Sequence, residues 1–86
     1  MKLLWEDRAW SDYLYWQSQD KKTLKRINAL IKDIQRSPYQ GIGKPEPLRG
    51  NLSGCWSRRI DDANRIVYFE QKDVIYIICC LGHYDD

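Results

Sequence analysis

The sequence is poor in the residue types that build metal sites and disulfide networks. It has one histidine, His83, and three cysteines, none of which shows Cys-x-x-Cys spacing. Zinc sites need clustered His and Cys ligands, and disulfide frameworks use even numbers of cysteines. We therefore expect no metal and no disulfide, and a protein that works in the reducing cytoplasm.

Long apolar runs are missing as well. The longest covers the eight residues 74–81, whereas a membrane-spanning helix needs about 20. Near the N-terminus, Glu6 and Asp7 interrupt the chain before the apolar core of a signal peptide could form. These absences predict a protein that neither spans a membrane nor is secreted.

Two common catalytic signatures are absent. The sequence contains no Gly-x-x-x-x-Gly-Lys-Ser/Thr loop for a nucleotide and no Gly-x-Ser-x-Gly motif for serine-dependent hydrolysis. It therefore gives no support to a P-loop nucleotidase or a serine hydrolase, and we expect no cofactor.

What the chain does have is the composition of one small globular domain, which we expect to cover residues 1–86. Its 86 residues are 43% hydrophobic and 30% charged. A domain of this size buries only roughly 60 to 65% of its unfolded surface, so help from a partner or a second copy is expected. Residues 21–65 hold eleven basic and four acidic residues, a net +7, between acidic flanks. This asymmetry favours a surface that meets a polyanion, although solvated lysines would give the same pattern.

The first half of the chain has the pattern of a short strand and two helices. Residues 2–5 are typical of a strand, and residues 7–19 of a helix with Trp10, Tyr13, Leu14 and Gln17 at helical spacing, which predicts that its aromatic residues lie in the core. Asp20 is the expected N-cap of a second helix that ends near Arg36. The apolar stripe of this second helix is formed by Leu24, Ile27, Leu30, Ile31 and Ile34.

The second half begins with a loop and continues with strands. Glycine and proline mark residues 38–53 as a long ordered loop, of the kind that often carries function. Residues 55–60, 64–70 and 74–81 have strand-like composition and are joined by three-residue connectors, which imply an antiparallel meander. The predicted class is α+β, with a short N-terminal strand, two helices, and an antiparallel β-meander that forms one sheet with the helices on one face.

Four cations of the second helix gather on one side, which we call the basic ridge. At about 100° per residue they fall within an arc of roughly 60°, away from the apolar stripe. The ridge could follow the phosphates of a nucleic acid, or it could be an ordinary solvated helix face. Its members are Lys21, Lys25, Lys32 and Arg36.

Three side chains could together supply the chemistry of RNA cleavage by the 2′-hydroxyl. That reaction needs a base for the hydroxyl proton, a cation for the charge on the phosphorane, and an acid for the departing 5′-oxygen. Histidine suits proton transfer near neutral pH, and His83 follows the last predicted strand. Glu46 stands between Pro45 and Pro47, which restrict the backbone and direct the carboxylate. Arg65 offers a permanent charge and a fork of donors.

Each of these residues also has a less specific explanation. A terminal histidine is often an inert surface residue, and a loop glutamate is often only solvated. Arg65 could pair with Asp61 or Glu70 instead of a phosphate. Arg58 and Arg59 are adjacent on one predicted strand and must point to opposite faces, so at most one of them can face a given cleft.

Motifs spread along nearly the whole chain resemble those of the Txe/YoeB family of toxins. The resemblance rests on Trp10, Tyr13-Leu14-Tyr15-Trp16-Gln17, Ile31-Lys32-Asp33, Gly43-Lys44-Pro45-Glu46-Pro47-Leu48, Leu52-Ser53-Gly54, Trp56-Ser57-Arg58-Arg59-Ile60, Asn64-Arg65-Ile66-Val67-Tyr68 and His83-Tyr84. It implies the toxin of a type II toxin-antitoxin system in the RelE/ParE superfamily, a ribosome-dependent mRNA endonuclease with a compact microbial-ribonuclease-like fold. It also implies a YefM-type antitoxin as partner and a homodimer.

Carried over by position, the resemblance assigns roles to single residues. It makes Glu46 the general base, Arg65 the transition-state stabiliser and His83 the general acid. Arg59 and Tyr84 would complete the site. The resemblance also favours contact of the basic ridge with ribosomal RNA over simple solvation.

Two further cations, Lys44 and Arg49, are expected to contact phosphate. The family usually has lysine at the position of Arg49. Both are cations, so phosphate attraction should survive, although an arginine fork differs in geometry from an ammonium group.

The C-terminus departs from the family pattern, which commonly stops at or just after the histidine-tyrosine pair. This chain adds Asp85 and Asp86. We hypothesise that these acids favour the protonated form of His83, because nearby negative charge stabilises a cation. An NMR titration of His83 with and without the two aspartates tests this, and an unchanged titration would contradict it.

Two other functions remain open at this point. A ParE-like toxin that is not a nuclease would share the fold, but it would not need Glu46, Arg65 and His83 together. An RNA-binding or protein-binding module of the same fold would bind its partner without cleaving anything.

Overall fold

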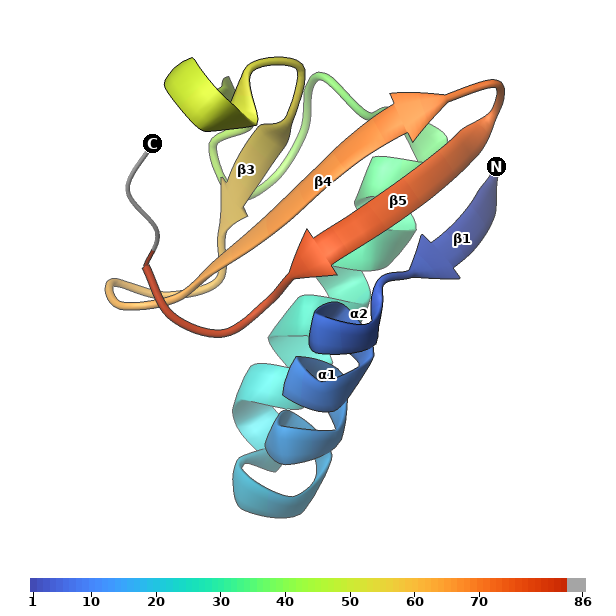
Figure 1. Cartoon of the computed structure of the whole chain (residues 1–86). Helices are drawn as coiled ribbons and strands as arrows, with labels where there is room; N and C mark the ends of the chain where they lie inside the picture. Colours follow the sequence, from blue (N-terminus) through green and yellow to red (C-terminus); the bar gives the residue numbers. More distant parts are fainter. Residues whose placement is uncertain (84–86) are drawn as a thin grey trace.

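The computed structural model describes residues 1–83, which form two helices packed against one face of a five-stranded sheet (Figure 1). The predicted α+β class is confirmed, and the first strand and both helices have the predicted bounds. The elements are β1 (Lys2–Trp5), α1 (Asp7–Gln19), α2 (Lys21–Arg36), β2 (Glu46–Pro47), the 3₁₀ helix η1 (Gly50–Leu52), β3 (Trp56–Arg59), β4 (Arg65–Gln71) and β5 (Val74–Cys79).

The sheet is mixed, which corrects the prediction of a purely antiparallel one. Its strand order is β1-β5-β4-β3-β2, and β3, β4 and β5 form the predicted antiparallel meander. However, β1 runs parallel to β5, with Leu3 opposite Ile75 and Trp5 opposite Ile77. Short connectors fix the direction of strands joined by hairpins, but they carry no information about a strand that precedes two helices.

The loop predicted over residues 38–53 is ordered and holds two small elements, β2 and η1. β2 adds an antiparallel strand beside β3, with Glu46 opposite Ser57 and Pro47 opposite Trp56. Proline is tolerated there because β2 lies at the edge of the sheet. The loop thus delivers Glu46 to the sheet in a fixed register.

The second helix follows its sequence signals closely. The Asp20 carboxylate accepts hydrogen bonds from the backbone N–H groups of Lys22 (3.1 Å) and Thr23 (3.2 Å), as an N-cap should. Hydrogen bonds from Thr23, its hydroxyl first, lower the pKa of Asp20 below its ordinary value. The predicted stripe faces the sheet, with Leu24 half-buried and the other four members buried.

The first helix confirms the predicted core position for two of its aromatic residues, Trp16 and Tyr13, but not for the rest of the predicted side. Trp10 is 47% exposed and Leu14 42%, whereas Asp12 and Trp16 are buried. Polar partners explain the choice, because both buried side chains bond the backbone of Cys80 after β5. Trp16 Nε1 donates to the carbonyl oxygen (2.8 Å), and Asp12 Oδ2 accepts from the N–H (3.0 Å). Helical spacing alone could not reveal these partners.

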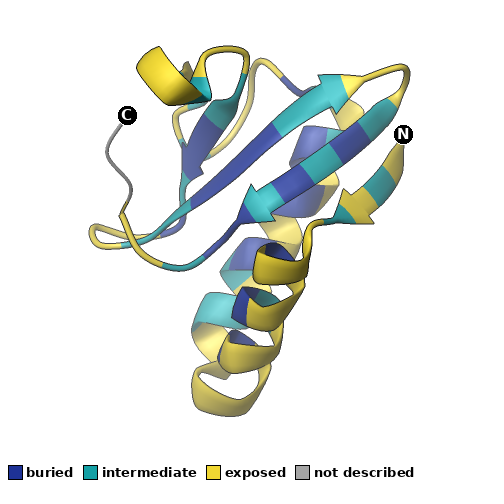
Figure 2. Ribbon diagram, viewed as in Figure 1, coloured by how far each residue is buried: buried dark blue, intermediate teal, exposed yellow. Residues whose placement is uncertain are grey.

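The hydrophobic core fills the layer between the helices and the sheet, as the buried stretches of β4 and β5 in Figure 2 show. It contains fully buried residues from α1, α2 and the central strands, among them Ala9, Ile27, Leu30, Ile34, Ile66, Tyr68, Ile75 and Ile77. Neither helix within residues 1–83 is long and apolar enough to cross a membrane.

Candidate active site

The strand β3 distributes its residues between the two faces of the sheet. Arg58 reaches α2 and so faces the helices, which leaves Ser57 and Arg59 on the opposite side. Across the sheet, Glu46 of β2 lies opposite Ser57, and Arg65 of β4 lies opposite Arg59. Residues directly opposite share a face. Glu46, Ser57, Arg59 and Arg65 therefore lie on what we call the open face, which neither α1 nor α2 covers (Figure 1).

The turn after β5 brings His83 to the same place. The backbone N–H of Arg65 donates to the carbonyl oxygen of Gly82 at 3.1 Å, and the N–H of Gly82 donates to Asn64 Oδ1 at 2.7 Å. Gly82 has a φ of 88°, a conformation that favours glycine. Arg65 Nε lies 3.5 Å from His83 Nε2, at the long limit of a hydrogen bond. The structure thus places the predicted acid beside the predicted cation.

The ion pairs that could have occupied Arg65 are not found in the described part of the chain. The Asp61 carboxylate instead binds the turn between β3 and β4, where it accepts from the N–H and the side-chain amide of Asn64. The Glu70 carboxylate accepts from the Tyr39 hydroxyl at 3.1 Å. The guanidinium of Arg65 is therefore left to face His83 and the open face.

The loop cations and the candidate base are accessible. Lys44, Glu46 and Arg49 are all exposed, and Arg49 lies where η1 begins. Lys44 has a φ of 52°, in the left-handed region. The preceding carbonyl of Gly43 accepts the N–H of Arg59 at 2.7 Å, which ties this loop to β3 next to the site. Tyr84, Asp85 and Asp86 lie outside the described residues, so the expectations for them stay predictions.

Two buried polar atoms on the open face have no hydrogen-bond partner among residues 1–83. They are Ser57 Oγ and Arg59 Nε. Buried polar groups are normally paired, and leaving one unpaired costs about 1–3 kcal/mol. A site that binds an anion needs donors that the protein itself does not occupy, and Arg59 fits that requirement. Sequence reasoning did not identify Ser57, because its place beside Glu46 depends on the strand register.

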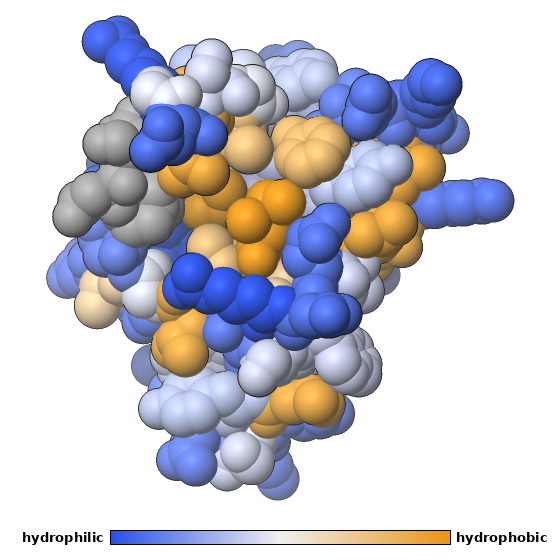
Figure 3. Space-filling model, in the orientation of Figure 1, coloured by the Kyte–Doolittle hydropathy of each residue, from blue (hydrophilic) through white to orange (hydrophobic). Residues whose placement is uncertain are grey.

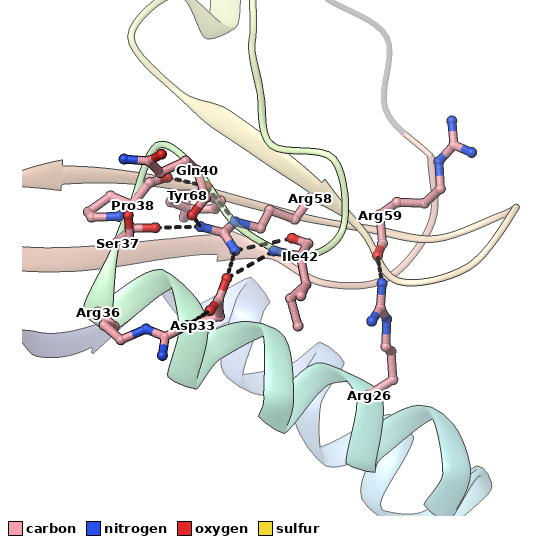
Figure 4. A network of polar contacts seen from close by, with 10 residues as sticks. All are labelled: Arg26, Asp33, Arg36, Ser37, Pro38, Gln40, Ile42, Arg58, Arg59 and Tyr68. Atoms are coloured by element: carbon pink, nitrogen blue, oxygen red, sulfur yellow. Dashed lines mark hydrogen bonds and ion pairs between the residues drawn. The ribbon is translucent and has the colours of Figure 1, made fainter.

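The other arginine of the pair is used by the fold. Arg58 is fully buried and forms an ion pair with Asp33 of α2 (Figure 4). Its hydrogen bond is the main reason that the pKa of Asp33 is lowered. The prediction that Arg58 and Arg59 face opposite sides is confirmed, and only Arg59 belongs to the open face.

The basic ridge lies on the exposed side of α2, so the sheet separates it from the candidate active site. Lys21, Lys25 and Lys32 are exposed. Arg36 is also accessible, but its Nη2 is 2.5 Å from Asp33 Oδ1. The lysines are therefore better suited than Arg36 to meet a polyanion.

The open face also has an apolar part. Phe69 and Tyr76 lie opposite each other on β4 and β5, and their rings stack with centroids 4.5 Å apart. Figure 3 shows an apolar centre on this side of the molecule, surrounded by hydrophilic side chains. Aromatic rings of this kind are common stacking surfaces for RNA bases.

Thiol chemistry finds no support in the structure. Burial raises the pKa of Cys80 to about 12, and it also raises the pKa of Cys55 and Cys79. A thiol that stays protonated is a poor nucleophile. Within residues 1–83, no three His, Cys, Asp or Glu side chains come together as a metal site.

The chain is similar to known bacterial toxins. A family described as the YoeB-like toxin of bacterial type II toxin-antitoxin systems matches residues 5–84. "Toxin YoeB" of Escherichia coli (strain K12) is 55% identical over 84 residues, which are 98% of this chain and all of that protein.

Two solved structures from Staphylococcus aureus share the fold. One is a heterotetrameric complex of YoeB and YefM, with a TM-score of 0.89 and 44% identity. The other is a YoeB dimer, with a TM-score of 0.90 and 44% identity. Each covers 98% of this chain and 98% of the solved one.

Proposed function

This chain belongs to the family of YoeB-like toxins of bacterial type II toxin-antitoxin systems, and we propose that it is a metal-independent endoribonuclease that cleaves mRNA in the ribosomal A site. The observation that carries the proposal is the contact of Arg65 with His83 on the open face, in the same sheet row as Arg59. A permanent cation beside a group that can hold a proton suits the breakdown of a phosphodiester.

In the proposed reaction, Glu46 takes the proton of the RNA 2′-hydroxyl, and the resulting oxygen attacks the adjacent phosphorus. Arg65 and Arg59 bind the oxygens of the phosphorane, where negative charge develops. His83 gives a proton to the departing 5′-oxygen. A positioned acid or base typically contributes 10²- to 10⁴-fold to a rate. Lys44 and Arg49 are accessible enough to bind the flanking phosphates, and Tyr84 would complete the site.

Exposure of the site supports a requirement for the ribosome. Glu46 and His83 are both exposed in the free chain. Water around them weakens every electrostatic interaction with the phosphorane. Docking against the ribosome would exclude that water and fix the RNA. The exposed lysines of the basic ridge, Lys21, Lys25 and Lys32, provide the second surface for ribosomal RNA, with Arg36 contributing less because of its ion pair.

Partners follow from the relatives. We propose a YefM-type antitoxin that covers the open face, and a homodimer, since solved YoeB structures contain both arrangements. A segment that is disordered when free could fold along such a basic surface. Because the proposed substrate is mRNA on translating ribosomes, the proposed location is the cytoplasm.

The test is primer extension on a defined mRNA, with and without programmed ribosomes. His83→Gln removes the acid, and Lys2→Gln is the matched control, because Lys2 is exposed at the start of β1 on the other edge of the sheet. We expect a discrete cut in the A-site codon with wild type and Lys2→Gln, and its loss with His83→Gln. No cut with wild type would contradict the nuclease and favour a ParE-like or purely binding function. Cutting without ribosomes would contradict the ribosome requirement alone.

A further inference from the structure

The guanidinium of Arg58 is fully buried and uses all of its donors. An arginine side chain has five N–H groups, and each has an acceptor here (Figure 4). The five acceptors are the Tyr68 hydroxyl (3.1 Å from Nε), Asp33 Oδ2 (2.5 Å) and the Ile42 carbonyl (3.1 Å) on Nη1, and the carbonyls of Ser37 (2.5 Å) and Gln40 (3.0 Å) on Nη2.

These acceptors concentrate on one stretch of backbone. Three of them are carbonyls of the segment 37–42, which directly follows α2 and has no helix or strand of its own. The same cluster holds two more backbone groups of this segment. The Tyr68 hydroxyl donates to the carbonyl of Pro38 at 2.6 Å, and Asp33 Oδ2 accepts the N–H of Ile42 at 3.0 Å. Three side chains thus hold this segment through five of its backbone groups.

The packing leaves no room for a side chain at Gly41. A Cβ on Gly41 would lie 2.0 Å from Asp33 Oδ2 and 3.0 Å from Arg58 Nη1, and Gly41 has a φ of 132°. Only glycine fits this position. The backbone at Gly41 therefore packs directly against Asp33 and the Arg58 guanidinium.

The contacts of this segment also help to place the candidate base, Glu46. Beyond Ile42, the carbonyl of Gly43 accepts the N–H of Arg59, and Glu46 then pairs with Ser57. Arg58 stands between Ser57 and Arg59 in β3. One strand therefore sets the register of Glu46, holds the segment that leads to it and presents a cation of the site.

A requirement for stability alone would not call for this arrangement, because buried ion pairs can often be replaced by apolar side chains without loss of stability. We propose that Arg58, with Asp33 and Tyr68, is a positioning device that fixes the loop bearing Glu46 and so sets where the general base meets the RNA. The proposal rests on the proposed nuclease function. Arg58 does not touch the RNA, and it acts through the loop.

The test uses a mild variant and a strong one. Tyr68→Phe removes one hydroxyl and keeps the ring in the core, and Arg58→Lys keeps the charge but has three donors instead of five. Ile27→Val is the control, because Ile27 is equally buried but lies in the first half of α2, away from the segment 37–42. All variants are studied at temperatures where thermal unfolding shows that they are fully folded.

Two readouts separate positioning from stability. The first is hydrogen exchange of the Ile42 and Arg59 amides, which report the loop contacts directly. The second is the kinetics of ribosome-dependent cleavage. For Tyr68→Phe we expect faster exchange at both amides and a fall in kcat of about tenfold with little change in KM, since small displacements of a base slow the chemistry. Arg58→Lys should show a larger effect of the same kind.

The control decides between the explanations. If Ile27→Val lowers kcat as much as Tyr68→Phe at matched stability, the proposed positioning role is wrong. Unchanged hydrogen exchange at the Ile42 and Arg59 amides in both Tyr68→Phe and Arg58→Lys would also overturn it. If the wild type cleaves nothing, the nuclease function fails, and the exchange data still decide whether Arg58 fixes the loop.

Discussion

Arg58 and Arg59 are consecutive residues of one strand, yet they are used in opposite ways. The guanidinium of Arg58 is fully buried, with an acceptor for every donor. Arg59 is half-buried, and its Nε has no partner among residues 1–83. The period-two geometry of a strand sends the two side chains to different faces. An arginine whose N–H groups all have acceptors within the protein therefore serves the structure. An arginine with an unpaired N–H group is available to a ligand.

The same contrast applies to the two faces of the sheet. On the helix side, polar groups such as Asp12, Asp33 and Tyr68 are paired with defined partners. On the open face, Ser57 Oγ and Arg59 Nε are unpaired in the described structure. Unpaired donors cost stability in the free protein, and they become useful when a phosphorane offers charged acceptors. In the described structure, the buried side-chain atoms without a hydrogen-bond partner thus lie at the candidate active site.

The largest effect is expected for Arg58→Ala. Removing one partner of a buried ion pair typically costs about 3–5 kcal/mol, because the other charge stays buried and unpaired. Small domains have only about 5–15 kcal/mol of total stability, so this variant should be close to unfolding. Urea unfolding followed by circular dichroism measures the change. A loss below about 1 kcal/mol would show that the Arg58 network contributes little to the fold.

The second prediction concerns the neighbouring position. Arg59→Ala should change stability by less than about 1 kcal/mol, because Arg59 Nε makes no hydrogen bond within residues 1–83 that would be lost. Cleavage should fall about 10²- to 10³-fold, the typical cost of removing one donor that stabilises transition-state charge. Single-turnover cleavage and urea unfolding on the same preparation measure both. If Arg59→Ala unfolds as easily as Arg58→Ala, the distinction between the two arginines is wrong.

The sequence predicted most of the elements, because their signals are local. The strand Lys2–Trp5, the Asp20 cap and the stripe of α2 depend on near neighbours, and all are confirmed. The exposed side of α1 was missed because two bonds to Cys80, more than sixty residues away, decide which side is buried. The parallel pairing of β1 with β5 was missed for a similar reason.

The candidate site could be predicted only in part. Residue types and family resemblance pointed to Glu46, Arg65 and His83, and the structure places Arg65 beside His83. The alternation of side chains along β3 indicated that Arg58 and Arg59 point to opposite faces of the sheet. It did not indicate which of them faces the helices. That choice follows from Asp33, whose carboxylate lies at the end of α2. The unpaired Ser57 needed the strand register, which sequence alone does not give.

The third prediction concerns the basic ridge. Of its four cations, Arg36 is linked to the network around Arg58 through its ion pair with Asp33. Reversing Lys25 and Lys32 to glutamate should weaken ribosome association roughly tenfold at low salt. The slope of log affinity against log salt should become less steep by about 1.5, as expected when two phosphate contacts are lost. Lys2→Glu together with Lys72→Glu makes the same charge change at exposed sites off the ridge and should alter binding less. Equal effects of the two double variants would assign the loss to net charge.

The smallest effect is expected for Ser57→Ala. This variant tests whether the buried hydroxyl of Ser57 is unpaired, in contrast to the paired groups around Arg58. Alanine removes a hydroxyl that has no partner in the described structure and keeps the backbone of β3. The free protein should become more stable, by up to about 1 kcal/mol, because an unsatisfied buried donor carries a desolvation penalty. Cleavage should fall severalfold if the hydroxyl finds its partner only when Glu46 and RNA meet beside it. Thermal unfolding and kcat measure the two effects. Destabilisation by Ser57→Ala would mean that the Ser57 hydroxyl already has a hydrogen-bond partner in the free protein. The unpaired polar groups of the open face would then belong to its arginines alone.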